Sequence, residues 1–118
     1  MLKADFLFSG YGRIVGLCIK GHAGFEEEGR DIVCAAVSSA AYLVVNTAQE
    51  ELGVRLCGLS VREGDMRFCL RPWDEPLCRS LMNGLRLHLL GLAEQYPKHI
   101  EVRAKIVSYH NILKKGRK

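Results

Sequence analysis

The spacing of apolar residues changes period along this chain, and that change constrains the fold more than any other feature. Apolar and polar residues alternate over residues 2–8, and residues 13–20 are rich in Ile, Val and Leu, as in β-strands. Gly10-Tyr11-Gly12 between them is predicted to be a turn, because glycine readily adopts positive φ angles. The chain therefore begins with a predicted β-hairpin.

Two longer segments have the spacing of helices with one buried face. From about residue 31 to 52, apolar or small side chains recur at intervals of three and four, and Asp31 is a suitable N-cap. The second helix is predicted to begin near Asp74, also a possible N-cap, and to end at Pro97. The predicted buried residues are Val33, Ala36, Val37, Ala40, Leu43, Val44 and Thr47 in the first helix and Cys78, Leu81, Leu85, Leu89 and Leu92 in the second.

A second hairpin is predicted between these helices. Residues 56–62 and 66–71 have the composition of strands, and Glu63-Gly64-Asp65 between them is a turn sequence. A two-residue turn at Gly64-Asp65 would bring four apolar side chains onto one face. The predicted cross-strand pairs are Val61 with Phe68 and Leu59 with Leu70.

The last strand and the order of elements give the fold class. Apolar residues alternate with charged ones over residues 100–106, which predicts a strand with one face in solvent. The order is ββαββαβ, so we expect an α+β fold of two layers, with a mostly antiparallel sheet and two helices packed on one face. The other face of the sheet would be polar or covered by a partner, and the small core favours a dimer.

Composition supports a single compact domain. The chain has 118 residues, of which 48% are hydrophobic and 25% charged, so it is too short for two separate cores and too apolar to stay disordered. No apolar run reaches the ~18 residues of a membrane helix, and the first residues do not resemble a signal segment. We expect a cytoplasmic protein without a membrane partner, with one domain over residues 1–113 and a basic tail over 114–118.

The charge distribution does not indicate a dedicated nucleic-acid-binding protein. The net charge is +4, and much of it lies in residues 114–118. Such a tail can contact phosphates, but a charged terminus is usually solvated. The rest of the chain mixes both signs without a basic stripe interleaved with aromatic residues, so we expect at most weak nucleic-acid contacts through the tail.

Five cysteines are present, and this count excludes a chain in which all of them pair. The cysteines are Cys18, Cys34, Cys57, Cys69 and Cys78. No C-x-x-C motif occurs, which argues against a zinc ribbon or a thioredoxin-type site. We expect reduced thiols, most of which act as small buried hydrophobic side chains.

Cys34 differs from the others in its predicted position. If Asp31 is the N-cap, Cys34 is the third residue of the first helix, where the helix dipole and unpaired N–H groups favour the thiolate. His22, in a glycine-rich loop after a strand, is placed to activate the thiol and protonate a leaving amine. We interpret His22 and Cys34 as a candidate Cys-His catalytic dyad that needs no metal or cofactor.

Other roles for these two side chains remain open at this stage. A cysteine near a helix start is usually packed, and a histidine after a strand usually lies at the surface. Zinc bound by Cys18, His22 and Cys34 is a third possibility, although no fourth ligand is evident. A redox-sensing role for the Cys34 thiol is also open.

Several neighbours of the dyad are candidate supporting residues. The glycines of the loop would allow it to move as a lid and would let a substrate backbone approach closely. Asp31 would cap the helix or orient the site, and Ser38 would line the pocket one turn beyond Cys34. The candidate supporting residues are Gly21, Gly24, Phe25, Gly29, Asp31 and Ser38.

The segment from Gly21 to Ser38 resembles the signature of the bacterial ribosomal-processing cysteine protease family, Prp. The resemblance consists of Gly-His-Ala-Gly at 21–24, Gly29, and Asp-Ile-Val-Cys-Ala-Ala-Val-Ser at 31–38, and it extends over nearly the whole chain. It implies a cytoplasmic, homodimeric cysteine endopeptidase in which His22 and Cys34 form the dyad. It also implies a substrate, the N-terminal extension peptide of bacterial large-subunit ribosomal protein twenty-seven.

The family's substrate segment has paired aromatic residues followed by a small residue and lysines. Phe25, Tyr42 and the dimer interface are therefore candidates for holding the aromatic residues. The acidic run Glu26-Glu27-Glu28 would attract the lysines or would be only a solvated face of the loop. The alternative from another class is a non-catalytic ribosome- or RNA-associated binding module that uses the basic tail.

Overall fold

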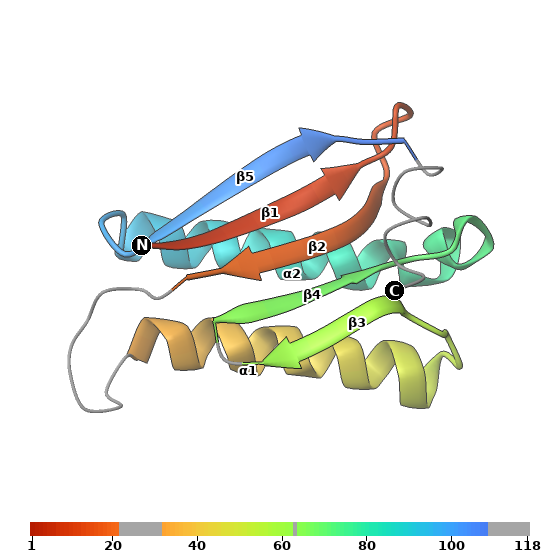
Figure 1. Cartoon of the computed structure of the whole chain (residues 1–118), viewed down its shortest axis with the longest axis horizontal. Coiled ribbons are helices and arrows are strands. Elements are labelled where there is room, and N and C mark those ends of the chain that lie inside the picture. The colour runs from red at the N-terminus through yellow and green to blue at the C-terminus, as the bar shows by residue number, and fades with distance from the viewer. Residues whose placement is uncertain (22–31, 63, 109–118) are drawn as a thin grey trace.

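The computed structural model describes residues 1–21, 32–62 and 64–108, and its elements follow the predicted order. In chain order the elements are β1 (Leu2–Phe8), β2 (Ile14–Lys20), α1 (Ile32–Asn46), β3 (Cys57–Arg62), β4 (Asp65–Cys69), α2 (Glu75–Gln95) and β5 (Ile100–Ile106). A π-helical turn over Thr47–Glu51 extends α1, and a 3-10 turn over Pro72–Asp74 precedes α2 (Figure 1).

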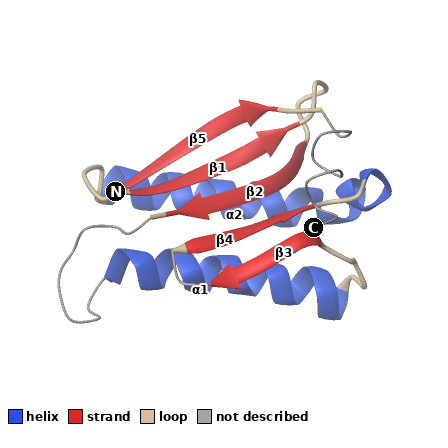
Figure 2. Cartoon of the chain, viewed as in Figure 1, coloured by secondary structure: helices blue, strands red, loops and turns tan. Residues whose placement is uncertain are grey.

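The strands form one sheet in the order β3-β4-β2-β1-β5. The pairs β1–β2, β2–β4 and β3–β4 are antiparallel, whereas β5 is parallel to β1. Both helices lie on the same side of the sheet (Figure 2). The predicted α+β fold, with two layers and a mostly antiparallel sheet, is therefore confirmed. The one parallel pair arises because α2 carries the chain back across the sheet before β5.

The core lies between the sheet and the two helices. In α2 the predicted stripe is confirmed, since Cys78, Leu85 and Leu89 are buried and Leu81 and Leu92 are partly buried against the core. The core side chains from the sheet include Ala4, Phe6, Leu17, Ile19, Met66 and Phe68.

The phase of α1 differs in part from the prediction. Val33, Val37 and Val44 are buried as expected, but the side chain of Leu43 is 65% exposed. The buried row runs in steps of four residues through Ala41 and turns away from Leu43. Because α1 is apolar on almost every side, the spacing alone did not determine which side faces the sheet.

The helical segment Ile32–Glu51 is long and apolar enough to cross a membrane by length and composition, with a mean hydropathy of 1.4 over an 18-residue window. Uncharged polar residues such as Asn46 and Gln49 interrupt the segment, so its uninterrupted apolar run is shorter than the ~18 residues of a membrane helix. One side of this segment contributes to the core between helices and sheet. The core helix of a globular protein passes the same test, and 33% of this window is buried in the structure.

The register of the second hairpin also differs from the prediction. Val61 lies opposite Met66, so the predicted pairing of Val61 with Phe68 is wrong, as is that of Leu59 with Leu70. The strands meet at Arg62 opposite Asp65, so the turn lies one residue earlier than expected. Next to the turn, this shift by two residues keeps each side chain on its face of the sheet, and an apolar pattern of period two cannot distinguish the two registers. An irregularity of β3 between Cys57 and Ser60 then reverses the alternation, so Cys57 pairs with Cys69.

Asp74 precedes α2 as predicted, but its side chain does not cap the helix. Its carboxylate instead accepts a hydrogen bond of 2.8 Å from Nε of Arg71, and it is buried in that pair. The first turn of α2 contains Pro76, whose missing N–H is not needed there.

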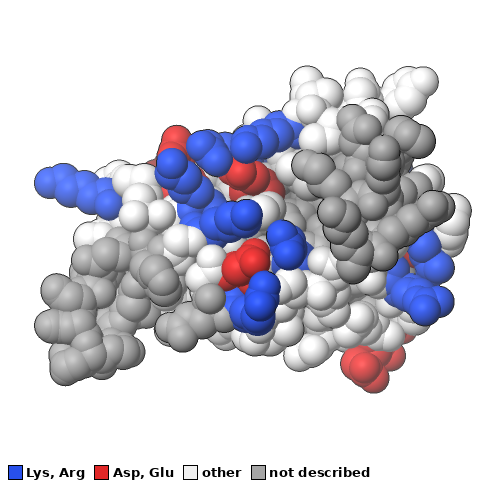
Figure 3. Space-filling view, in the orientation of Figure 1, with Lys and Arg blue, Asp and Glu red and all other residues white. Residues whose placement is uncertain are grey.

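The sheet face that the helices leave uncovered carries charged side chains beside a small apolar cluster around Val15 and Cys69. Asp5 on β1 lies opposite Arg103 on β5, and Arg103 donates two hydrogen bonds, of 2.6 and 3.0 Å, to its carboxylate. Lys105 adds an ion pair of 3.2 Å. These partners, Arg103 first, hold the pKa of Asp5 below its usual value, despite the opposing effect of burial. Basic side chains gather over the strands on this face (Figure 3).

Candidate active site

Cys34 is the third residue of α1, which begins at Ile32. The predicted position on the first turn of the helix is therefore confirmed. The first N–H groups of a helix have no partners within it, and the helix dipole places partial positive charge there. The first turn of α1 carries no acidic side chain that would oppose this effect. The position thus favours a thiolate and offers donors to an oxyanion.

Cys34 begins a strip of side chains at the boundary between core and solvent. It is half-buried and packs against the main core, and Ser38, one turn further along α1, is also half-buried. Tyr42 follows one more turn on, and its hydroxyl donates a hydrogen bond of 3.3 Å to the carbonyl of Val61 on β3. The strip therefore leads from the start of α1 to the edge strand β3, and Ser38 lies one turn beyond Cys34 as predicted.

Gly21 lies between the end of β2 and His22, at a position that only glycine occupies without strain. Its φ is 96°, and a Cβ atom at this position would lie 2.6 Å from the carbonyl oxygen of Met1. Its N–H donates a hydrogen bond of 3.1 Å to the carbonyl of Gly64. This contact ties the end of β2 to the β3–β4 turn, at the same end of the molecule where α1 begins (Figure 1).

The remaining predicted site residues lie outside the described part of the chain. They are His22, Gly24, Phe25, Gly29 and Asp31. The pairing of His22 with Cys34 and the cap by Asp31 therefore stay predictions. Of the predicted site residues, the structure places Gly21, Cys34 and Ser38.

Three of the other thiols have raised pKa values. Burial raises the pKa of Cys18, and it raises that of Cys78, to which Asp74 and Glu75 add. Burial and the neighbouring Cys57 raise the pKa of Cys69 to about 12. Thiols that stay protonated at neutral pH are poor nucleophiles, which separates them from a cysteine at a helix start.

The alternative zinc site at Cys18, His22 and Cys34 does not fit the fold. Cys18 lies opposite Asp5 and Arg67 on the uncovered face of the sheet, whereas Cys34 belongs to the helix layer on the other face. Two side chains separated by the sheet cannot bind the same ion.

Sequence reasoning missed a cavity of about 1130 Å³ on the uncovered face. Cys18, Cys57 and Cys69 contribute to its lining, together with basic residues from four different segments. Each of these residues occupies an ordinary strand position in the sequence. Only the strand order and register bring them together, so the local pattern contained no signal for the cavity.

Comparison with known proteins identifies relatives with the same fold. The model of the family described as cysteine protease Prp matches residues 1–101. A structure of the ribosomal processing protease Prp from Staphylococcus aureus with a covalently linked product peptide has a TM-score of 0.80 at 22% identity, covering 89% of this chain and 100% of that one. A structure of the same protease with a substrate peptide has a TM-score of 0.76 at 21% identity, with the same coverage. The structure of SMU.848 from Streptococcus mutans has a TM-score of 0.75 at 26% identity, covering 91% of this chain and 96% of that one. No curated protein matches the chain.

Proposed function

Because the chain belongs to the cysteine protease Prp family, we propose that this cysteine peptidase processes a ribosomal protein, removing the N-terminal extension of bacterial large-subunit protein twenty-seven in the cytoplasm. The observation that carries the proposal is the position of Cys34 on the first turn of α1. Similar folds in the ribosomal processing protease Prp, solved with product and substrate peptides, support the substrate class.

In the proposed reaction, His22 takes the thiol proton of Cys34, and the thiolate attacks the scissile carbonyl carbon. The N–H groups at the start of α1 stabilise the oxyanion of the tetrahedral intermediate. His22 then gives its proton to the leaving amine, and a thioester to Cys34 remains. Water, activated by His22, hydrolyses the thioester and restores the thiol. No metal or cofactor takes part in these steps.

The supporting residues have separate roles in this proposal. Gly21 fixes the chain path directly before His22, and Ser38 lines the pocket next to Cys34 along α1. Gly24 and Gly29 let the substrate backbone approach, and Asp31 caps the helix. Phe25 is a contact for the aromatic residues of the substrate.

The acidic run Glu26-Glu27-Glu28 attracts the lysines beyond the cleavage point in this proposal. Replacing all three with Gln is expected to lower kcat/KM at low salt and to change it little at high salt, because salt screens exposed charges. An unchanged kcat/KM at low salt would remove this role.

We also propose that the enzyme is a homodimer. Exposed apolar side chains support an interface: Ile32 and Leu43 on α1 lie largely in solvent, and Leu59 and Val61 on β3 are partly exposed. Light scattering at micromolar concentration should give twice the mass of the chain. A monomer mass would contradict this assembly.

Kinetics with a peptide that spans the ribosomal extension tests the proposed function. Cys34→Ala and His22→Ala are each expected to lower kcat by about 10³-fold or more, since both act on the reacting atoms. Cys34→Ala should still bind the peptide. Cys18→Ala is the matched control, because Cys18 is also half-buried but lies on the other face of the sheet. Equal cleavage by wild type and Cys34→Ala would refute the proposal.

Cys34→Ala and a deletion of residues 114–118 together distinguish the protease from an RNA-associated module. Such a module would lose RNA binding when residues 114–118 are deleted, and it would be indifferent to Cys34→Ala.

A further inference from the structure

The cavity on the uncovered face of the sheet brings two cysteines of neighbouring strands together. Cys57 on the edge strand β3 pairs with Cys69 on β4, next to the irregularity of β3 between Cys57 and Ser60. In regular antiparallel strands, paired residues have Cα atoms about 4.5–5.5 Å apart, which is within the range that a disulfide spans. The Cys69 thiol donates a hydrogen bond of 3.5 Å to the carbonyl oxygen of Cys57. The pair is therefore placed to form a cross-strand disulfide.

The surroundings give the two thiols different access to solvent. Both cysteines line the cavity, but Cys57 is half-buried, whereas Cys69 is only 5% exposed and packs with Val15. An incoming reagent therefore reaches the Cys57 sulfur first. Cys69 is the second thiol to react, because it is the less exposed of the two.

The high pKa of Cys69 does not prevent this second step. Burial is the largest cause of the shift to about 12, and the other two causes are the charge and the hydrogen bond of Cys57. Both contributions from Cys57 disappear once its sulfur is bonded to another sulfur. Burial remains, so the pKa of Cys69 stays above its usual value and the second exchange step is slower than the first.

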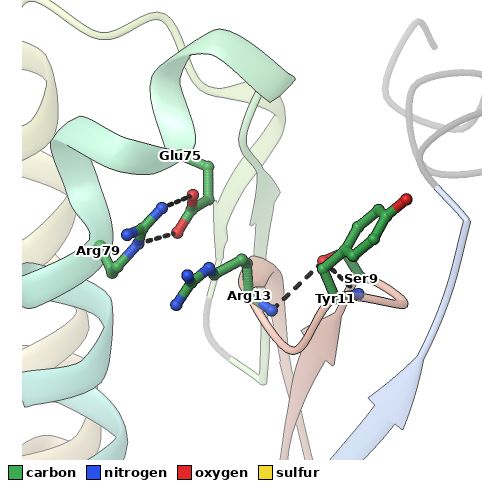
Figure 4. Close-up of polar contacts among 5 residues, drawn as sticks. All are labelled: Ser9, Tyr11, Arg13, Glu75 and Arg79. Atoms are coloured by element: carbon green, nitrogen blue, oxygen red, sulfur yellow. Dashed lines mark hydrogen bonds and ion pairs between the residues drawn. The ribbon is translucent and has the colours of Figure 1, made fainter.

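The charges around the cavity favour an anionic reagent. Arg13, Lys20, Arg67 and Lys105 line it, and the acidic lining residues are Asp5 and Glu75. Arg79, which is not part of the lining, binds the Glu75 carboxylate through hydrogen bonds of 2.8 and 2.9 Å (Figure 4).

Asp5 is likewise bound at two points by Arg103, outside the lining. Lys20 lies between Lys3 on β1 and Asp65 on β4 in the sheet. Arg67 lies 4.0 Å from Asp65, which is outside the lining, but the four basic lining residues outnumber the two acidic ones. The cavity therefore keeps an excess of positive charge.

We propose that this cavity is a thiol–disulfide exchange site that takes anionic low-molecular-weight disulfides, such as oxidised glutathione, and is converted to a Cys57–Cys69 disulfide. The Cys57 thiolate attacks one sulfur of the reagent, a mixed disulfide forms, and the other half leaves as a thiolate that takes a proton from water. The Cys69 thiolate then attacks the Cys57 sulfur and expels the second half. Two protein thiols are oxidised, and one small disulfide is reduced to two thiols.

The test uses the full chain carrying Cys34→Ala, so that the proposed nucleophile does not react. After incubation with oxidised glutathione, intact mass should fall by two hydrogen atoms, and peptide mapping should find Cys57 joined to Cys69. Cys69→Ala should instead accumulate a mixed disulfide at Cys57, whereas Cys78→Ser, the matched control, should behave as the parent. Modification at Cys18 alone, or no reaction at Cys57 in a folded chain, would overturn the proposal.

Three reagents of different charge test the ligand class. At low salt, oxidised glutathione should react on the order of tenfold faster than cationic cystamine, with neutral hydroxyethyl disulfide between them. Lys20→Glu should reduce the difference in rate between oxidised glutathione and cystamine. Lys98→Glu should not, because Lys98 lies outside the cavity lining. Equal rates for the three reagents at low salt would refute the anion preference.

Discussion

Three matched Gly→Ala substitutions can separate the effects of backbone strain and steric contact before the active site. They are made at Gly21, Gly12 and Gly10. Gly21 combines a φ of 96° with a carbonyl oxygen 2.6 Å from the position of a Cβ atom. Gly12 has a φ of 80° with open space around it, and Gly10 has open space without a positive φ. The three variants therefore test backbone strain plus contact, strain alone, and neither.

The structure gives an expected magnitude for each variant. A positive φ costs an L-residue about 1–2 kcal/mol, so Gly12→Ala should lose about that much free energy of unfolding. The Met1 carbonyl adjoins Leu2, which is buried at the start of β1, and displacing packed atoms typically costs about 1–3 kcal/mol. Gly21→Ala should therefore lose about 2–5 kcal/mol in all. Gly10→Ala should change the free energy of unfolding by less than about 1 kcal/mol, and toward greater stability.

Urea unfolding followed by circular dichroism, under reducing conditions, measures these differences. Because a typical domain is stable by only about 5–15 kcal/mol, the loss in Gly21→Ala should be plain from the transition midpoint. If Gly21→Ala is no less stable than Gly12→Ala, the contact with the Met1 carbonyl carries no cost and the reasoning fails. Equal stability of all three variants would also refute the argument from φ.

Three further predictions concern the core, the charged face and the thiols. Leu89→Ala should lose about 2–5 kcal/mol in the same unfolding assay, because Leu89 is fully buried, whereas the exposed Leu87→Ala should stay within about 0.5 kcal/mol of wild type. Asp5→Asn should have a lower free energy of unfolding than wild type at neutral pH. Because folding lowers the pKa of Asp5 from 3.8, this difference in stability should be complete above that value and should vanish as acid protonates Asp5 in the folded state. A stability difference that persists at the lowest pH would contradict this. Iodoacetamide at neutral pH should alkylate Cys34 before Cys18, Cys69 or Cys78, because the pKa values of these three thiols are raised. If peptide mapping finds one of the three modified first, the assignment of the reactive thiol is wrong.

Local features of the fold were predictable from sequence because they depend on short-range periodicity. Alternation over β1 and β5, and the spacing of Cys78, Leu85 and Leu89 in α2, correctly predicted strands and a helix with one buried face. The position of Cys34 is local in the same sense, since it depends only on where α1 begins.

Features that depend on contacts between distant segments were not predictable in this way. The side of α1 that faces the sheet was ambiguous because that helix is apolar nearly all round, so Leu43 was assigned to the wrong side. The register of β3 against β4 was wrong because a shift of two residues leaves the alternation unchanged. The basic cavity was missed because the strand order β3-β4-β2-β1-β5 brings its residues together from separate strands.

Covalent trapping tests most directly whether Cys34 is the residue that attacks the substrate. A peptide of the ribosomal extension that ends in a chloromethyl ketone at the scissile position should form one adduct with the wild-type chain, and peptide mapping should place it on Cys34. The adduct should be absent in Cys34→Ala and slower to form in His22→Ala. An adduct on Cys18, Cys57, Cys69 or Cys78, with Cys34 unmodified, would contradict the account.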